Sequence, residues 1–203
     1  YADKIEFKSS IGNTDFDVIA LFDNHVVIIE IKHLVTPYDP KRYYEDRQEI
    51  KKAIKQLKLR KQVLLRDWAL IRDITKGFLP PEPYPEERMI QLVCTNIDSF
   101  TSLEIDGIRI VDESVLIRFF SDNGQYVKIW SGPKIYKKEK IWENSQPTID
   151  DFKRYIASPT AVKWYREVVK RKNITIPRYG EGDYLGTVNY ILDEDIVKFD
   201  RQI

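Results

Sequence analysis

The stretch Asp15-Phe-Asp-Val-Ile-Ala-Leu-Phe-Asp-Asn-His-Val-Val-Ile-Ile-Glu-Ile-Lys-His33 decides the fold of this 203-residue chain. Two apolar runs flank Asp23 and Asn24, and an Asp-Asn pair tolerates the positive φ angles of a tight hairpin turn. We therefore predict a β-hairpin with these two residues as its loop.

The two-residue loop fixes the register of the hairpin. Side chains alternate between the two faces of a strand, so every second opposed pair lies on the same face. That face is apolar near the turn and charged at the open end. Its pairs are Leu21 with Val26, Ile19 with Ile28, Asp17 with Glu30, and Asp15 with Lys32. An odd number of loop residues would put the two acids on opposite faces.

The pairing of Asp17 with Glu30 calls for a positive group. Opposed side chains have Cβ atoms about 4.5–5.5 Å apart, and two carboxylates that close repel by about 3–4 kcal/mol at an effective dielectric constant of about 20. Magnesium is the candidate because it prefers oxygen ligands and usually takes one or two carboxylates plus water and phosphate. Lys32 is placed to meet the same phosphate, and Asp15 is expected to pair with Lys32 across the strands.

The composition limits the class of protein. The chain carries 33 Lys and Arg against 32 Asp and Glu, so any nucleic-acid-binding surface must be local. The single cysteine, Cys94, excludes an intramolecular disulfide and a multi-cysteine zinc site, and it fits a reducing cytoplasm. We expect no membrane-spanning segment and no signal peptide. Because the chain begins at Tyr1, we leave open an upstream domain, a partner protein or a homodimer.

Apolar periodicity predicts one mixed α/β domain in the first part of the chain. A strand around residues 5–7 would complete a meander with the hairpin, and a long amphipathic helix, broken once, would run from Glu45 to Ile71. Strands are expected at residues 89–94 and 108–111, with a strand or short helix at residues 115–120. The order β, β, β, α, β, β predicts a mixed sheet with helical cover.

The last part of the chain has a different character, and we assign residues 1–122 to the core and residues 123–203 to a C-terminal extension. An edge strand is expected at residues 126–130. Thr148 and Asp151 form a capping-box pattern that begins a helix. Ser158-Pro159 is expected to begin a second helix that continues through residues 162–172, and a strand is expected at residues 188–192.

Two helices carry basic faces that would hold a nucleic-acid backbone without reading its sequence. The alternative is an ordinary solvated helix face. The candidate nucleic-acid-binding residues are Lys52, Lys55, Lys58, Arg60, Lys163 and Arg166. Gln56 and Arg60, one turn apart, could also face the charged end of the hairpin.

The spacing of Asp17, Glu30 and Lys32 resembles the PD-(D/E)xK nuclease superfamily, in its restriction-endonuclease-like and resolvase-like branches. An acid on one strand is followed on the next by Glu-Ile-Lys. The likeness covers residues 5–120 in topology, but only Asp17 to Lys32 is specific. Phe16 stands where the family usually has proline, and no helix precedes Ile5. The missing helix lies in upstream sequence, or Glu6 or a C-terminal helix takes its place.

The resemblance implies a restriction-endonuclease-like fold, an α/β (α+β) architecture with a mixed sheet, a long helix after the hairpin and a C-terminal helical extension. It also implies a metal site for Mg²⁺ or Mn²⁺, formed by the carboxylates of Asp17 and Glu30 and the carbonyl of Ile31. Lys32 would assist attack on the phosphate, and Gln56 would match a glutamine that recurs after the motif in some branches.

The function we predict is metal-dependent hydrolysis of phosphodiester bonds, with DNA as the favoured substrate and endonucleolytic cleavage as the favoured mode. Two alternatives stay open. The first is a nuclease that acts on RNA, because phosphate contacts look alike in both polymers. The second is a catalytically inactive, nuclease-like module for nucleic-acid binding or assembly.

Overall fold

The computed structural model describes residues 2–9, 12–121, 124–128, 135–163, 169–177 and 184–192. The chain forms two compact units, Tyr1–Ser158 and Pro159–Ile203. We predicted a boundary at residue 122, but the first unit continues to Ser158. The reason is that Phe152, Tyr155 and Ile156 pack into the same apolar cluster as Phe119.

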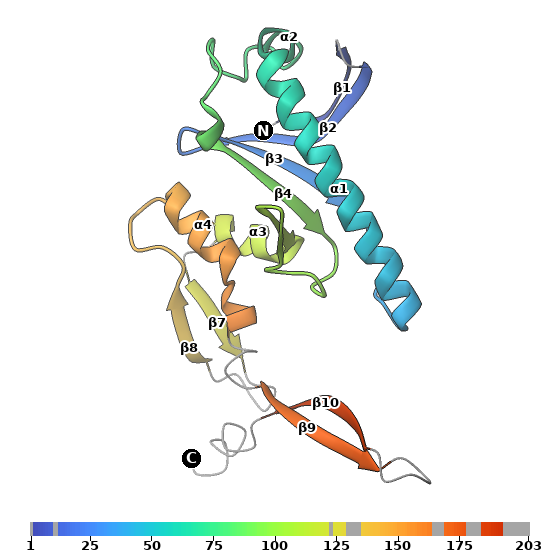
Figure 1. The fold of residues 1–203 in the computed structure, drawn as a ribbon. Helices are drawn as coiled ribbons and strands as arrows, with labels where there is room; N and C mark the ends of the chain where they lie inside the picture. The colour runs from blue at the N-terminus through green and yellow to red at the C-terminus, as the bar shows by residue number, and fades with distance from the viewer. Residues whose placement is uncertain are drawn as a thin grey trace. The chain divides into compact units, whose positions relative to one another are not determined.

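A mixed sheet is the centre of the first unit, and Figure 1 shows its strands. Among the described residues it has six strands in the order β1-β2-β3-β4-β6-β5. β1, β2 and β3 form an antiparallel meander, β4 runs parallel to β3, and β6 runs parallel to β4. This confirms the predicted mixed sheet. The strands are β1 (Ala2–Ser9), β2 (Gly12–Phe22), β3 (His25–Lys32), β4 (Met89–Thr95), β5 (Glu104–Ile105) and β6 (Ile108–Asp112).

The hairpin of β2 and β3 has the predicted register. Asp23 and Asn24 have φ angles of 46° and 56°, as the two loop residues of a tight hairpin turn require. Phe22 pairs with His25, and the pairing continues to Val18 opposite Ile29. The loop therefore has two residues, and both acids lie on the same face.

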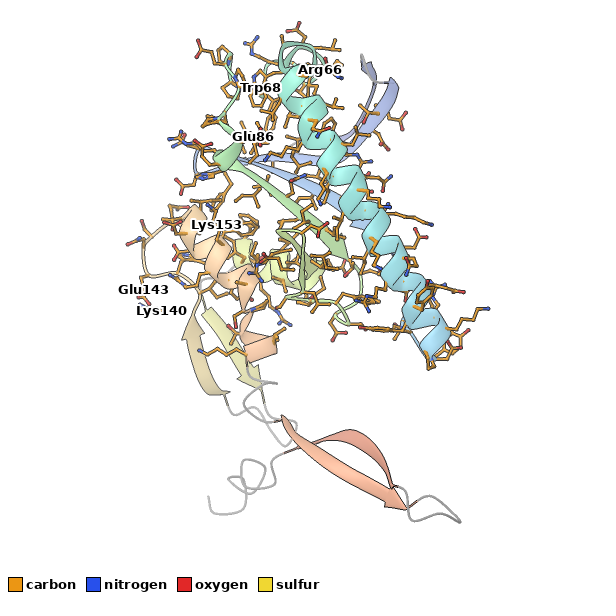
Figure 2. The ribbon with its side chains drawn as sticks, viewed as in Figure 1. Arg66, Trp68, Glu86, Lys140, Glu143 and Lys153 are labelled. Atoms are coloured by element: carbon orange, nitrogen blue, oxygen red, sulfur yellow. The ribbon has the colours of Figure 1, made fainter. Side chains whose placement is uncertain are left out.

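The long helix begins earlier than its apolar pattern predicted. α1 spans Pro40–Arg66 instead of beginning at Glu45. The side chain of Asp39 accepts a hydrogen bond from the backbone N–H of Arg42 at 2.6 Å, and Pro40 occupies the first turn, where proline costs no hydrogen bond. The predicted single break lies at Asp67, after which α2 (Trp68–Ile74) begins; Arg66 and Trp68 mark it in Figure 2.

Helices cover the two faces of the sheet with separate apolar clusters. Ile28 of β3 packs with Ile50 and Leu57 of α1 on one face. Val27, which directly precedes Ile28, packs with Phe119 and Phe152 on the other face of the sheet. This second layer contains α3 (Glu113–Ser121), which settles the choice between strand and helix at residues 115–120, and α4 (Ile149–Ala157). A sheet buried on both faces explains why β3 and β4 are almost continuously apolar.

The start of α4 confirms the predicted capping box. The hydroxyl of Thr148 accepts from the backbone N–H of Asp151 at 3.2 Å, and a carboxylate oxygen of Asp151 accepts from the backbone N–H of Thr148 at 3.1 Å. A third contact comes from the hairpin turn, where Oδ2 of Asp23 accepts from the backbone N–H of Ile149 at 2.8 Å. Three polar contacts thus satisfy donors that a bare helix end would leave open.

Thr148→Ala is expected to lower the free energy of unfolding by about 1–2 kcal/mol, because it removes the hydroxyl that caps α4. Urea unfolding followed by tryptophan fluorescence would measure the loss. Thr148→Ser, which keeps the hydroxyl, is the matched control and should stay near the wild type. Equal stability of the alanine and serine variants would contradict a capping role.

The remaining strands form two separate pairs. β7 (Gly124–Lys128) pairs with β8 (Ile135–Lys140), as an edge strand near residues 126–130 anticipated, although residues 129–130 lie outside the described part. In the second unit β9 (Val169–Pro177) pairs with β10 (Tyr184–Leu192). The helix predicted through residue 172 is therefore wrong from Val169 onward. The β-branched run Ile174-Thr175-Ile176 favours the strand. None of the described helices is long and apolar enough to cross a membrane.

Candidate functional site

Two acidic side chains lie at the open end of the hairpin. Continuing the observed register by one step past Val18 and Ile29 places Asp17 opposite Glu30. Oδ2 of Asp17 accepts a hydrogen bond from the backbone N–H of Ile31 at 2.8 Å. Asp17 is half-buried, whereas Glu30 is only 1% exposed. The sequence thus brings both acids to one place, at the edge of a buried apolar face.

The positive charge expected between the carboxylates comes from the chain itself. Nζ of Lys32 lies 2.7 Å from Oε1 of Glu30, and Nη1 of Arg60 forms an ion pair with Oε2 of the same carboxylate. Nη2 of Arg60 lies 2.6 Å from Oδ1 of Asp15. Asp15 therefore pairs with Arg60 and not with Lys32 as predicted. Arg60 reaches both acids because a planar guanidinium presents several donors in a fixed fork.

Arg60 lies in the apolar stripe of α1. Ala53, Leu57 and Leu64 on that stripe are fully buried, and Arg60, three residues after Leu57, is 4% exposed. A side chain this buried cannot contact an external phosphate, so its predicted nucleic-acid role is wrong. The available signal was position: a lone arginine at a core-facing helix position needs a buried acid as its partner. The other prediction for Arg60, that it faces the charged end of the hairpin, is confirmed by its ion pairs with Asp15 and Glu30.

The other predicted residues of α1 lie at the surface. Gln56 is exposed and contributes nothing to the contacts around Glu30. Lys52 donates to Glu49 at 2.6 Å, and this hydrogen bond lowers the pKa of Glu49. Lys58 lies 2.7 Å from Asp106, and Lys55 is exposed.

Two candidate residues come from the C-terminal part of the chain. Lys163 is exposed and lies in the second compact unit. Arg166 lies outside the described residues.

The donor set at Asp17 and Glu30 suits a hard cation, with one condition. Two carboxylates on neighbouring strands and the backbone carbonyl of Ile31 are all oxygen ligands, which Mg²⁺ prefers. Oδ1 of Asp17 has no hydrogen-bond or ion-pair partner within the described residues. Oε1 of Glu30 becomes available only when Lys32, whose side chain is 22% exposed, moves off it. The residues therefore fit one divalent cation if Lys32 is displaced.

The described ranges contain no other site with more metal-binding side chains. No group of three or more His, Cys, Asp or Glu side chains lies there in a metal-binding arrangement. Burial raises the pKa of the Cys94 thiol to about 11, and the neighbouring Asp112 adds to the effect. Because the thiolate is the form that binds metals, Cys94 is a poor ligand at neutral pH.

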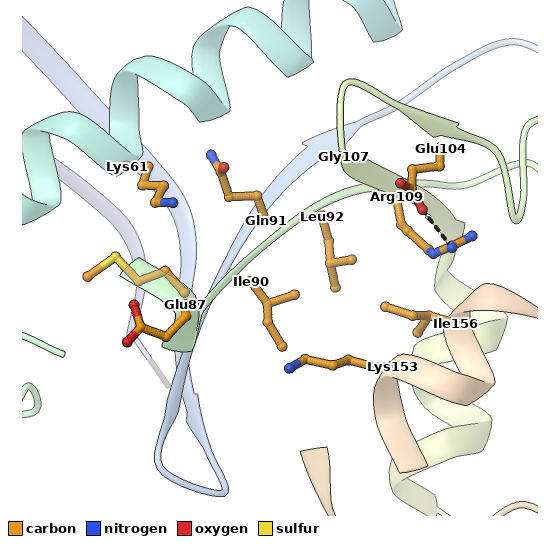
Figure 3. Close-up of a pocket in the computed structure, with 11 residues that line it drawn as sticks. Lys61, Glu87, Ile90, Gln91, Leu92, Glu104, Gly107, Arg109, Lys153 and Ile156 are labelled. Carbon is orange, nitrogen blue, oxygen red and sulfur yellow. Dashed lines mark ion pairs between the residues drawn. The ribbon is translucent and has the colours of Figure 1, made fainter. Parts of the chain in front are cut away.

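A pocket of about 380 Å³ lies at another place, near the start of β4 (Figure 3). Lys61 and Gln91 line it, as do Lys153 and Ile156 of α4. Its Glu104 and Arg109 form an ion pair at 2.6 Å, which leaves little free charge on that wall. Asp17, Glu30 and Lys32 are not among its lining residues. The candidate site is thus an open strand end and not this pocket.

Comparison with models of known protein families, with curated protein sequences and with solved structures found no match.

Proposed function

We propose that the chain is a Mg²⁺- or Mn²⁺-dependent nuclease that hydrolyses phosphodiester bonds, with DNA as the favoured substrate. The carrying observation is the convergence of Asp17, Glu30 and Lys32 at one end of an otherwise apolar hairpin. Charged side chains that gather in an otherwise apolar setting are typical of functional sites.

The order of the elements supports the same proposal. A three-strand meander, a long helix and then a strand parallel to the third is the topology that the restriction-endonuclease-like resemblance implies. The resemblance rests on Asp17 to Lys32 for its specific part. The proposed fold family is therefore an inference from topology and motif together.

The contacts of Asp17, Glu30, Lys32 and Arg60 suggest a separate role for each residue in the proposed hydrolysis. A divalent ion, when bound, would supply a Lewis acid and an activated water. Asp17 and Glu30 would offer one carboxylate oxygen each. Lys32, once off Glu30, would place its ammonium against the scissile phosphate and stabilise the negative charge that develops there. Arg60 would stay on Oε2 of Glu30 and fix the orientation of that carboxylate.

The test is a cleavage panel of linear duplex, circular duplex, single-stranded DNA and RNA with Mg²⁺ or Mn²⁺. We expect metal-dependent cleavage that chelation with EDTA abolishes, and nicking of the circular duplex would identify an endonuclease. Cleavage of RNA alone would assign the alternative substrate. Cleavage that persists in EDTA would contradict the proposal.

A second candidate is a catalytically inactive binding or assembly module. One observation favours it: Lys32 and Arg60 already balance the charge of Glu30 without any metal. Calorimetric titration with Mn²⁺ separates the two candidates. Heat of binding that disappears in a charge-removing Asp17 variant supports the nuclease, whereas no uptake by the folded wild type supports the module.

A further inference from the structure

Basic residues outnumber acidic residues on α1. The helix has ten Lys and Arg residues but only three acids, Glu45, Asp46 and Glu49. Seven of the ten cations form ion pairs with acids in the described residues: Lys41, Arg42, Lys52, Lys58, Arg60, Lys61 and Arg66. The other three, Arg47, Lys51 and Lys55, make no ion pair within the described part of the chain.

These three cations follow one another at steps of four residues, so they lie in one line along the helix. We call Arg47, Lys51 and Lys55 the cation row. All three are exposed, and Lys58 continues the line one turn beyond Lys55. With a rise of about 1.5 Å per residue, successive charges of the row are about 6 Å apart along the helix axis.

The row is unfavourable for the helix itself. Like charges one turn apart repel and weaken a helix, and acids were available, since Glu45 and Glu49 pair with cations elsewhere on α1. A chain with a net charge of only +1 thus concentrates unpaired charge of one sign in one place. Local arrangements that oppose stability are where function is expected.

We propose that the cation row binds the phosphate backbone of double-stranded nucleic acid. Each strand of a duplex carries a phosphate about every 3.4 Å along its axis, so charges about 6 Å apart lie near every second phosphate. Contacts of this kind position a duplex without reading its sequence. Exposed Tyr44, one turn before Arg47, adds an aromatic ring at the end of the row.

Other anionic partners fit the helix less well. An amphipathic helix that binds a lipid surface needs an apolar face to insert beside its charges, but Ile50, Ile54 and Leu57 of α1 are buried against the sheet. A regular line of equal charges matches a regular polymer better than an irregular acidic protein segment. The inference does not depend on the proposed hydrolysis, because an inactive binding module would use the same row.

The experiment measures binding in EDTA, so that cleavage does not interfere. Fluorescence anisotropy of a labelled DNA duplex is followed at several salt concentrations with the full chain. The test variant combines Arg47→Gln, Lys51→Gln and Lys55→Gln. The matched control combines Arg118→Gln, Lys76→Gln and Lys153→Gln, which removes the same number of charges from exposed positions. Arg118 lies on α3, and Lys153, labelled in Figure 2, lies on α4.

We expect the test variant to bind at least about tenfold more weakly at low salt and its log–log salt slope to be shallower by about 2–3. The control should retain the wild-type slope, and a scrambled duplex should bind equally well. Equal losses in both variants, or an unchanged slope in the test variant, would overturn the proposal. The proposal would also be overturned if the wild-type protein did not bind the duplex, even if it bound phosphatidylserine vesicles or a poly-glutamate peptide.

Discussion

Asp17→Asn is expected to lower metal-dependent cleavage by about 10²–10³-fold while the fold stays intact. The substitution removes the charge that would meet the cation, and one lost electrostatic contact at a reacting centre typically costs this much. Asparagine keeps a side-chain oxygen that can accept from the backbone N–H of Ile31, the contact that Oδ2 of Asp17 makes at 2.8 Å. The hairpin register should therefore survive.

Asp17 is a cleaner position for this test than Glu30. Asp17 is half-buried, whereas removing Glu30 would leave Lys32 and Arg60 facing one another without their shared acid. The measurement is kcat/KM on the best substrate of the panel, with Mn²⁺ affinity and circular dichroism as parallel readouts. The matched control is Asp73→Asn, an exposed aspartate in α2. Wild-type cleavage by a folded Asp17→Asn protein would exclude the metal site.

Arg60→Met is expected to lower the free energy of unfolding by about 3–5 kcal/mol, the usual cost of breaking a buried ion pair from one side. Methionine can replace the apolar stem of the arginine side chain but carries no charge, so Glu30, 1% exposed, would keep only Lys32 as its counter-ion. Asp15 would lose its partner too, but its side chain is 54% exposed and water can replace the contact.

Urea unfolding followed by the fluorescence of buried Trp68 and Trp142 would measure this loss. Arg66→Met, at a position with a 44% exposed side chain, is the control and should change stability by less than about 0.5 kcal/mol. Arg60→Lys should fall between the two, since it keeps the charge but not the fork. A loss below about 1 kcal/mol for Arg60→Met would show that the pairing contributes little.

The hairpin could be predicted from sequence because its determinants are local. Asp23 and Asn24 set the loop length, the loop length sets the register, and the register places Asp17 opposite Glu30. The mixed sheet and a single break in the long helix followed from periodicity and the order of elements, whereas the position of the break at Asp67 came only from the structure.

What the sequence did not reveal depends on contacts between distant segments. The helical pattern predicts that Arg60 faces the charged end of the hairpin, but its burial and its ion pairs with Asp15 and Glu30 arise only when α1 folds onto the meander. Val169 begins a strand because it pairs with Leu192, which no local period can indicate. The boundary moved to Ser158 for the same reason, since α4 completes the apolar layer around Phe119.

The hydrogen bond between Asp23 and Ile149 gives the hairpin a second anchor. Its open end is held to α1 through Arg60, and its closed end is held to α4 through this bond of 2.8 Å and through the ring of Phe22, which packs against Phe152. The strands that carry Asp17 and Glu30 are thus fastened to both helical layers, on opposite sides of the sheet. Any partner or substitution that pulls α4 from the turn acts directly on the element that carries both acids.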